Sequence, residues 1–370
     1  MRITAVDSFV LHVPVTGGHI EDSSHKVDRW GVPMARIETN EGITGFGYTG
    51  THGHLPTDRL IAECIKEAYG PLLIGEDPMS TEALWNKLYN CSPIRWVGRS
   101  GITHLALSAV DIALWDIKAK AAGAPLWKLL GGDEEKRIEA YNTDWGWLHL
   151  SLETLVSGCK RLVEEEGYNG VKIKVGSSDI QVDSKRIAAV RDAIGPERKL
   201  MVDANGKFDL PTALRMGKYL SDYDVVWFEE PLWFDDLLGH VRLASAIDTP
   251  IALGEQLYTL CDFANFVAMG AVHIVQADAT RLAGVTEWLK VADLAYAHRL
   301  PVVPHVGDMA QVHLHLCIAH PACDTLEYIP WLKEVFEEPA RVRDGRFCVP
   351  QMPGASTTPT ESALARFRVA

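Results

Sequence analysis

The sequence predicts an N-terminal α+β region followed by an α/β barrel of eight parallel strands. Near residue 137 the pattern changes from strands followed by helices to strict alternation of one strand with one helix, which is typical of a parallel sheet covered by helices. Polar residues also stand at the C-terminal end of nearly every predicted strand. This distribution favours a closed barrel over the alternative, an open doubly wound sheet, because an open sheet gathers its polar residues at one switch point.

The N-terminal region begins with three predicted strands, at 3–13, 33–38 and 43–48. Helical patterns follow at 58–69, 80–90 and 101–122. The last helix keeps apolar residues on one face and ends before Gly123, a residue type that commonly stops helices. Strands followed by helices predict an α+β domain.

The second region repeats short apolar runs that predict buried strands. These runs are 138–141, 171–175, 200–202, 225–228, 251–253, 274–275, 302–303 and 325–326. Amphipathic segments such as 151–165 and 283–298 separate them. Residues after about 341 leave this rhythm, and we expect them to return to the N-terminal domain. The predicted division is an N-terminal domain at 1–126, a barrel at 127–340 and a C-terminal segment at 341–370.

The composition is ordinary for a soluble globular protein. The formal net charge is −13, from 49 acidic and 36 basic residues, which argues against nucleic acid or an anionic membrane surface as the main partner. No stretch resembles a signal peptide or reaches the length of a membrane span, and the seven scattered cysteines form no CxxC pair. We expect a cytoplasmic homo-oligomer that binds a small carboxylic acid.

Three acidic residues stand at the ends of successive predicted strands. Asp203 and Glu229 are 26 residues apart, and so are Glu229 and Glu255, which is consistent with one β/α unit of a barrel. The carboxylates should therefore converge on one rim, where they would repel one another without a cation. Hard oxygen ligands favour Mg²⁺ over Zn²⁺. The alternative of three unrelated surface acids does not explain the spacing, so we predict a magnesium site.

Two kinds of base are predicted beside this metal site. Lys172 and Lys174 alternate with Ile173 in a buried strand, so both side chains should face the barrel interior. A nearby metal and a second ammonium should help one lysine to lose its proton and act as a base. Asp278 and His305 end two later strands, where the carboxylate can orient the imidazole for proton transfer. The structural alternatives are solvated or ion-paired lysines, and a core histidine beside an unrelated aspartate.

These groups suit removal of a proton next to a carboxylate. Removal places a second negative charge on the substrate, and a divalent cation with a nearby ammonium can stabilise that charge as it forms. A lysine on one side and a histidine on the other can reach opposite faces of the α-carbon. The first step is therefore predicted to give an enolate, whose fate depends on the second base.

In these features the chain resembles the mandelate racemase subgroup of the enolase superfamily, in which muconate lactonizing enzyme-like and sugar-acid dehydratase-like proteins are found. The resemblance covers nearly the whole chain. The motifs that carry it are the Lys172/Lys174 pair, the acidic runs around Asp203, Glu229 and Glu255, the Asp278/His305 pair, Glu327, and the segments 109–116 and 125–132. Their joint order and spacing are far more specific than any one of them.

The resemblance implies an α+β capping domain over a modified (β/α)₇β barrel, with one essential Mg²⁺ per subunit. Carried over by position, Lys174 and His305 become the acid/base pair, and Asp278 orients His305. Lys172 is implied to neutralise the substrate carboxylate. Glu327 is implied to donate a hydrogen bond to the developing enolate.

The loops of the capping domain are implied to set substrate specificity, and here they are polar at 19–26 and 49–54. Asn205 and His52 are predicted substrate contacts together with Lys172. A polyhydroxylated sugar acid needs many hydrogen-bond partners, whereas an aryl pocket should be mostly apolar. The expected activity is therefore that of a lyase in carbohydrate catabolism, which dehydrates an aldonate or aldarate to a 2-keto-3-deoxy acid. His305 is the expected acid for the leaving β-hydroxyl.

Three other functions stay open at this point. A racemase or epimerase of a 2-hydroxy acid and a cycloisomerase of a sugar lactone or anhydro-sugar acid share the same first step, so the strand-end residues do not separate them. A non-catalytic binding barrel belongs to a different class. Such a barrel should have lost a metal ligand or a base, and none is missing from the sequence.

Overall fold

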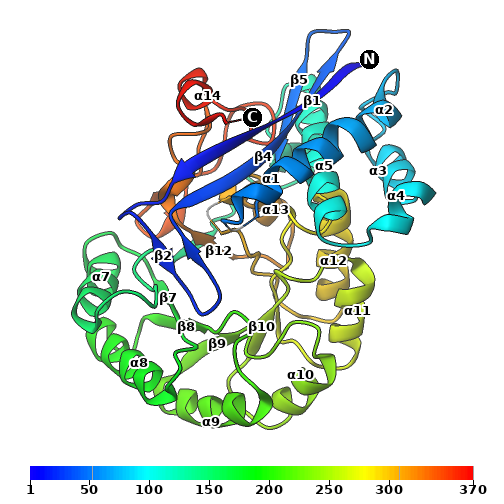
Figure 1. The fold of residues 1–370 in the computed structure, drawn as a ribbon. Helices are drawn as coiled ribbons and strands as arrows, with labels where there is room; N and C mark the ends of the chain where they lie inside the picture. Colours follow the sequence, from blue (N-terminus) through cyan, green and yellow to red (C-terminus); the bar gives the residue numbers. More distant parts are fainter. Residues whose placement is uncertain (52, 308, 370) are drawn as a thin grey trace.

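The computed structural model describes residues 1–51, 53–307 and 309–369. The N-terminal domain, which we call the cap, is built on a three-stranded antiparallel sheet (Figure 1). Its strands are β1 (Ile3–Pro14), β4 (Arg29–Thr39) and β5 (Thr44–Tyr48), in the order β1-β4-β5. They correspond to the three predicted strands. Gly42, with a φ of +78°, permits the tight turn between β4 and β5.

Helices pack against the cap sheet and connect it to the barrel. They are α1 (Leu55–Glu63), a π-helical segment (Cys64–Tyr69), α2 (Gly70–Leu73), α3 (Thr81–Tyr89), α4 (Ser92–Val97) and α5 (Ile102–Ala121). Gly47 lets α5 approach β5 closely, because a Cβ there would lie 1.9 Å from the carbonyl oxygen of Ala109. On another side of α5, Asp111 accepts hydrogen bonds from the backbone N–H and the hydroxyl of Thr286 in the barrel domain. These contacts bury α5 along most of its length.

Parallel strands and outer helices alternate in the barrel domain (Figure 1). The strands are β6 (Glu139–Asn142), β7 (Gly170–Lys174), β8 (Lys199–Asp203), β9 (Val225–Glu229), β10 (Ile251–Leu253), β11 (Ile274–Val275) and β12 (Thr325–Tyr328). The helices are α6 (Leu126–Leu129), α7 (Leu152–Glu164), α8 (Ile180–Ile194), α9 (Leu210–Leu220), α10 (Leu237–Ala244), α11 (Leu260–Ala268), α12 (Val285–Ala297) and α13 (Ala310–Ala319). Strands β6 to β11 pair in sequence order, and β12 pairs with β6. The predicted alternation is confirmed.

The barrel sheet is not closed, contrary to the expected ring of eight strands. The predicted seventh strand at 302–303 forms only an isolated bridge, from Val302 to Val275, among the described residues. Pro301 and Pro304 flank this segment, and proline offers no backbone N–H to a strand ladder. The N–H of Val303 still donates to the carbonyl of Val275 at 3.0 Å, so the segment stays attached to β11.

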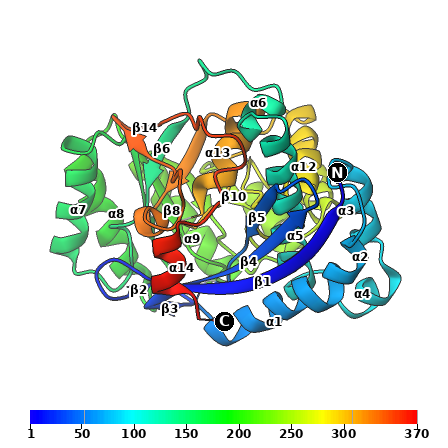
Figure 2. The same ribbon diagram turned by 90° about the horizontal axis from the view of Figure 1, so that it is seen from above.

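The C-terminal residues lie against both the barrel and the cap (Figure 2). β13 (Val342–Arg343) and β14 (Arg346–Phe347) form a hairpin whose second strand pairs with β6. Helix α14 (Glu361–Phe367) lies beside β1. The hydroxyl of Thr357 donates to the carbonyl of Phe46 at 2.5 Å, and the N–H of Val369 donates to the carbonyl of Val10 at 2.9 Å. The last segment of the chain therefore helps to hold the first.

Three further observations concern the cysteines, the possibility of a membrane span, and the exposed apolar surface. All seven cysteines are free thiols. In the part of the chain that the structure describes, no helix combines the length and the apolar character that a bilayer span requires. In α4, Trp96 and Val97 are 91% and 82% exposed, so this helix presents apolar surface to its surroundings.

Candidate active site

Three buried carboxylates converge at the C-terminal rim of the barrel, where the spacing predicted them. Asp203 ends β8 and pairs in register with Glu229, the last residue of β9, and Glu255 follows β10 by two residues. One oxygen from each carboxylate lies within 4.8 Å of the others. Burial raises the pKa of Glu229 to about 7 against the opposing effect of Lys172, and Asp203 adds to the rise. It is therefore unfavourable for all three carboxyl groups to be ionised at the same time.

Lys172 and Lys174 reach these carboxylates from the neighbouring strand, β7. Lys172 Nζ lies 2.7 Å from Glu229 Oε1 and 3.0 Å from Glu327 Oε1. Lys174 Nζ donates to Asp203 Oδ2 at 2.5 Å. Burial favours neutral lysines, but the carboxylates outweigh it and raise the pKa of both lysines. The protein groups by themselves therefore favour the ammonium form of both lysines. A cation held by the same carboxylates would weaken these contacts and ease the loss of a proton, so the role of one lysine as a base stays a prediction.

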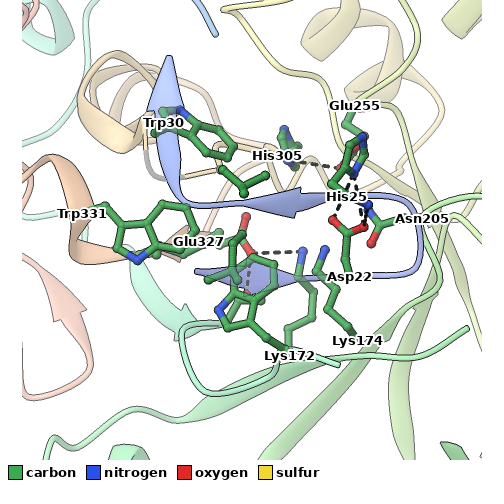
Figure 3. A pocket seen from close by; sticks show the side chains of 16 residues that line it. Asp22, His25, Trp30, Lys172, Lys174, Asn205, Glu255, His305, Glu327 and Trp331 are labelled. Carbon is green, nitrogen blue, oxygen red and sulfur yellow. Dashed lines mark hydrogen bonds and ion pairs between the residues drawn. The ribbon is translucent and has the colours of Figure 1, made fainter. Parts of the chain in front are cut away.

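His305 faces the pocket across from the two lysines (Figure 3). Its Nδ1 lies 2.8 Å from Asp278 Oδ2, and its Nε2 lies 3.1 Å from Glu255 Oε2. Burial opposes charge on the imidazole, but Glu255 and Asp278 outweigh it and raise the pKa of His305. The structure therefore brings the predicted dyad together and adds a contact between the histidine and the carboxylate cluster.

Asp278 has a second histidine partner that the sequence analysis did not assign. His313 projects from α13, and its Nε2 lies 3.1 Å from Asp278 Oδ1. Burial alone would raise the pKa of Asp278, but its neighbours His305 and His313 hold that pKa well below the usual range. Asp278 is thus a fixed carboxylate that can orient His305. The two-residue spacing of His313 and His315 carried no signal for this contact, because helical residues two apart do not share a face.

Glu327 lies in β12 and accepts hydrogen bonds in this structure. The hydroxyl of Thr143 donates to Glu327 Oε1 at 2.5 Å, and the Lys172 ammonium lies 3.0 Å from the same oxygen. Burial favours the neutral acid, but Lys172, His305 and Thr143 outweigh it and lower the pKa of Glu327. The implied role as a hydrogen-bond donor therefore requires Glu327 to gain a proton first. Thr143 was missed, although it directly follows β6 and so stands at a strand end like the other site residues.

A hairpin of the cap reaches over the rim of the barrel (Figure 1). It consists of β2 (Ile20–Glu21) and β3 (Lys26–Val27) with the loop between them. The hydroxyl of Ser23 donates to the carbonyl of Ala204 at 2.8 Å and fastens this loop to the barrel. Asp22 and His25 form an ion pair at 3.1 Å and line the same pocket as Lys174 (Figure 3). The polar loop at 19–26 thus contributes to the pocket.

Besides Lys172, two substrate contacts were predicted, and the structure describes only one of them. Asn205 lines the pocket, and its backbone N–H donates to Asp203 Oδ1 at 2.9 Å. His52 lies outside the described residues. Its neighbours Thr51 and His54 line an adjoining cleft, and Asn205 and Glu255 line both this cleft and the pocket. The second cap loop therefore borders a cleft that adjoins the catalytic pocket.

The side of the pocket across from Asp22 and His25 is aromatic, which the sequence did not predict (Figure 3). It is lined by Trp30 from β4, Trp147 from the loop after β6, and Trp331 from the 3₁₀ helix (Pro330–Leu332) after β12; we call these residues the tryptophan wall. The ring of Trp331 lies 5.5 Å from that of Trp30 (Figure 3). It lies 5.7 Å from the ring of Trp147. Lys174 Nζ lies 5.4 Å from the centre of the Trp147 ring. The only sequence signal was that Trp147 and Trp331 closely follow predicted strands.

Two family models match the sequence. Residues 5–131 match the N-terminal domain of mandelate racemase / muconate lactonizing enzyme, and residues 154–363 match the enolase C-terminal domain-like family. The chain belongs to the mandelate racemase / muconate lactonizing enzyme family. The resemblance inferred from the sequence is therefore confirmed, and so is the expected capping domain over an enolase-like α/β domain.

Similar members of the mandelate racemase / muconate lactonizing enzyme family act on sugar acids. The chain is 38% identical to L-talarate/galactarate dehydratase of Salmonella typhimurium, over 89% of this chain and 81% of the relative. It is 32% identical to D-galactarolactone cycloisomerase of Agrobacterium fabrum, over 100% of this chain and 99% of the relative. The solved structure of the S. typhimurium dehydratase with Mg and L-lyxarohydroxamate has a TM-score of 0.91 and 36% identity, covering 100% of this chain and 93% of that one.

The residues of this family member fit the Mg²⁺ found in that relative. Asp203, Glu229 and Glu255 would hold the ion with hard oxygen ligands, as Mg²⁺ prefers. Two buried oxygens beside them, Asn205 Oδ1 and Glu230 Oε1, have no hydrogen-bond partner among the residues that the structure describes, and buried polar atoms rarely stay unsatisfied. Burial and the nearby acids raise the pKa of Glu230 well above its usual range. The ligand role falls to Glu229 on geometry, because among the described residues it is Glu229 whose oxygen converges with those of Asp203 and Glu255.

Proposed function

We propose that this chain is a Mg²⁺-dependent sugar-acid dehydratase. It removes the proton next to the carboxylate of an aldonate or aldarate and expels the neighbouring β-hydroxyl as water, which gives a 2-keto-3-deoxy acid. The observation that carries the proposal is the placement of Lys174 and the His305–Asp278 dyad on two sides of one pocket beside the carboxylate cluster. The similarity to a dehydratase that acts on sugar acids supports the choice of reaction.

The first half of the reaction uses the lysine side of the pocket. Lys174 in its neutral form takes the α-proton, and Lys172 neutralises the substrate carboxylate. When bound, Mg²⁺ supplies positive charge that competes with the lysines for the carboxylates and stabilises the second negative charge of the substrate. Lys172 then shifts from Glu327 toward the substrate. Glu327 loses the ammonium that lowers its pKa, gains a proton and can donate to the enolate.

The second half uses the histidine side. His305 in its charged form donates the proton from Nε2 to the β-hydroxyl, and the C–O bond breaks as the enolate electrons form the C=C bond. Asp278 and the contact with Glu255 favour this charged form. The resulting enol loses its hydroxyl proton and takes a proton at the β-carbon, which gives the ketone. Lys174 then releases the α-proton to solvent and His305 takes one up, so both groups return to their starting states. The net change is the loss of one water molecule.

The tryptophan wall favours a second candidate function, racemisation of an aryl 2-hydroxy acid. Three indole rings beside the catalytic groups offer stacking area for an aromatic ring. The same two bases could remove a proton on one face of the α-carbon and return one on the other. The polar hairpin residues Asp22 and His25 favour the sugar acid, because they offer charged hydrogen-bonding groups that an aryl ring cannot use.

One experiment separates these functions. Aldonates, aldarates, their lactones and mandelate are incubated with the enzyme and Mg²⁺ in D₂O and followed by NMR. We expect a 2-keto-3-deoxy acid from at least one sugar acid. Deuterium at C2 with inverted configuration and no loss of water would replace the proposal with racemisation. Conversion of a lactone to an isomer would favour a cycloisomerase, and no reaction with any compound would favour a binding barrel.

We also propose a cytoplasmic homo-oligomer. The seven free thiols support a reducing compartment. The exposed Trp96 and Val97 in α4 support an interface, because proteins commonly cover apolar patches of this kind. Light scattering after gel filtration measures the mass, and a monomer would reject the oligomer.

A further inference from the structure

The carboxylate cluster contacts an aromatic residue that has no role in the reaction proposed above. Trp227 lies in β9 two residues before Glu229, so both side chains face the barrel interior. The indole Nε1–H of Trp227 donates to Glu229 Oε2 at 2.9 Å. Trp227 is 3% exposed and Glu229 is fully buried. This hydrogen bond is therefore shielded from competing water.

The two oxygens of Glu229 have different protein partners. Oε2 accepts from Trp227, and Oε1 lies 2.7 Å from the Lys172 ammonium. A carboxylate held at both oxygens cannot rotate about its terminal bond without breaking a contact. Each oxygen keeps a second lone pair for another partner, so these two contacts fix the plane of the carboxylate without using up its capacity to bind a cation.

A tyrosine fixes the indole in turn. The ring of Tyr141, at the base of the site in β6, lies 5.3 Å from the Trp227 ring at an interplanar angle of 81°. This edge-to-face arrangement is a favoured aromatic geometry. Lys172 Nζ lies 5.7 Å from the centre of the Tyr141 ring. Four consecutive contacts thus lie beneath the carboxylate cluster and join Glu229, Trp227, Tyr141 and Lys172 in a ring.

We propose that Trp227 is a positioning residue for Glu229, and that its N–H presets this carboxylate for binding a divalent cation. The inference rests on the proposed Mg²⁺ site. Groups that hydrogen-bond to metal ligands commonly change metal affinity by roughly 10- to 100-fold when they are removed. Loss of the Trp227 N–H frees one oxygen of Glu229 and leaves it buried without a partner. In such a variant, metal binding must fix the orientation of the Glu229 carboxylate, which is already fixed in the native protein.

Two substitutions separate the N–H from the bulk of the side chain. Trp227→Phe keeps an aromatic ring but removes the donor. Trp227→His removes the benzene ring of the indole, yet its Nε2 can occupy the position of the indole nitrogen, because each nitrogen lies across a five-membered ring from Cγ. Binding of Mn²⁺ to the EDTA-treated full-length proteins is measured by calorimetry, and circular dichroism checks the fold. We expect the phenylalanine variant to bind Mn²⁺ about tenfold more weakly or worse, and the histidine variant to recover a large part of the loss.

The control is Trp85→Phe. Trp85 is also a buried indole whose N–H is used, because it donates to the carbonyl of Ala283 at 2.8 Å, but it belongs to the cap. Its variant should bind Mn²⁺ like the native protein. Equal affinity of the native protein and a folded Trp227→Phe variant would overturn the inference, and so would a phenylalanine variant that binds better than the histidine variant. Failure of the native protein to bind Mn²⁺ would instead reject the metal site of the proposed function.

Discussion

At the scale of single residues, the roles of Lys174 and His305 should be distinguishable, because each residue acts in a different step of the reaction. Lys174→Ala should lower both deuterium exchange at C2 and dehydration by 10²- to 10⁴-fold, the usual contribution of a general base. His305→Asn should lower dehydration by a similar factor but keep the exchange, because the lysine still forms the enolate. NMR in D₂O reads both processes in one sample. Lys199→Ala is the matched control, since Lys199 pairs with Glu139 away from the site and its variant should keep full activity. Loss of exchange in His305→Asn would make the histidine the base.

The carboxylate cluster predicts a metal-dependent stability. At one hundred times its dissociation constant, Mg²⁺ should add about 2.7 kcal/mol to the free energy of unfolding of the EDTA-treated protein. Glu255→Gln removes one of the three charged ligands and should abolish most of this gain. Thermal unfolding with and without Mg²⁺ measures it. Glu76→Gln changes an acid at the surface and should leave the gain intact. An equal gain in Glu255→Gln would contradict the ligand assignment.

The site was predictable from the sequence where it depends on the strand period. Asp203, Glu229 and Glu255 recur at one interval because each β/α unit returns the chain to the same rim. The tryptophan wall was not predictable, because it depends on how a cap strand and two loops meet in space. The ion pairs of the two lysines were not predictable either. The pKa of each lysine depends on ångström-scale contacts with the carboxylates, which spacing along the chain does not report.

At the scale of elements, the β2–β3 hairpin should depend on a glycine beneath it. Gly176 has a φ of +104°, and a Cβ there would lie 2.8 Å from the Cβ of Ser23. Gly176→Ala should push the hairpin off the rim and raise KM roughly tenfold for a loss of about 1.4 kcal/mol in binding. It should also speed tryptic cleavage after Lys26, which is exposed but held in β3. Steady-state kinetics and limited proteolysis measure these effects.

Gly195→Ala is the control for backbone strain in this experiment. Gly195 also has a positive φ, of +78°, but a Cβ there would meet nothing within 4 Å. Both variants should lose about 1–2 kcal/mol of stability from the left-handed conformation. Only the Gly176 variant should change KM and proteolysis. The same change in both variants would mean that strain, rather than hairpin contact, is responsible.

The elements of the barrel were predictable because parallel strands are buried on both faces and read as apolar runs. The exception was the segment at 302–303, which was counted as a strand from its two valines alone. Pro301 and Pro304 were visible in the sequence and argue against a ladder there. The apolar composition of this run thus predicted correctly that the segment is buried. The prolines on either side decide whether its backbone can pair with a neighbouring strand.

At the scale of the whole molecule, stability should fall in mild acid through His315. The backbone N–H of Trp127 donates to His315 Nδ1 at 3.1 Å, and Ser356 lies 2.9 Å from Nε2, so this histidine joins three distant segments. Burial lowers the pKa of His315 from 6.5 to about 3. Below pH 6.5 the unfolded chain therefore binds a proton at His315, whereas the folded chain does not. The contribution of neutral His315 to the free energy of unfolding is complete above pH 6.5, and it declines by about 1.4 kcal/mol per pH unit below it.

His315→Asn tests this linkage, because the asparagine oxygen can still accept from Trp127. The stability difference between the native protein and the variant should shrink by about 2 kcal/mol between pH 8 and pH 5. Urea unfolding at pH 8, 6.5 and 5 measures the difference. A constant difference across this range would show that His315 is not held neutral in the folded protein.

The contact between the C-terminal segment and β1 has a consequence for synthesis on the ribosome. β1 is an edge strand of the cap sheet, and the bridge from Leu11 to Arg368 covers part of that edge. Arg368 is translated after the entire barrel, whereas β1 is translated before it. A nascent chain therefore carries an uncovered sheet edge while the whole barrel is being made, and such edges template aggregation. Chaperone demand should accordingly last until the segment around Arg368 has left the ribosome.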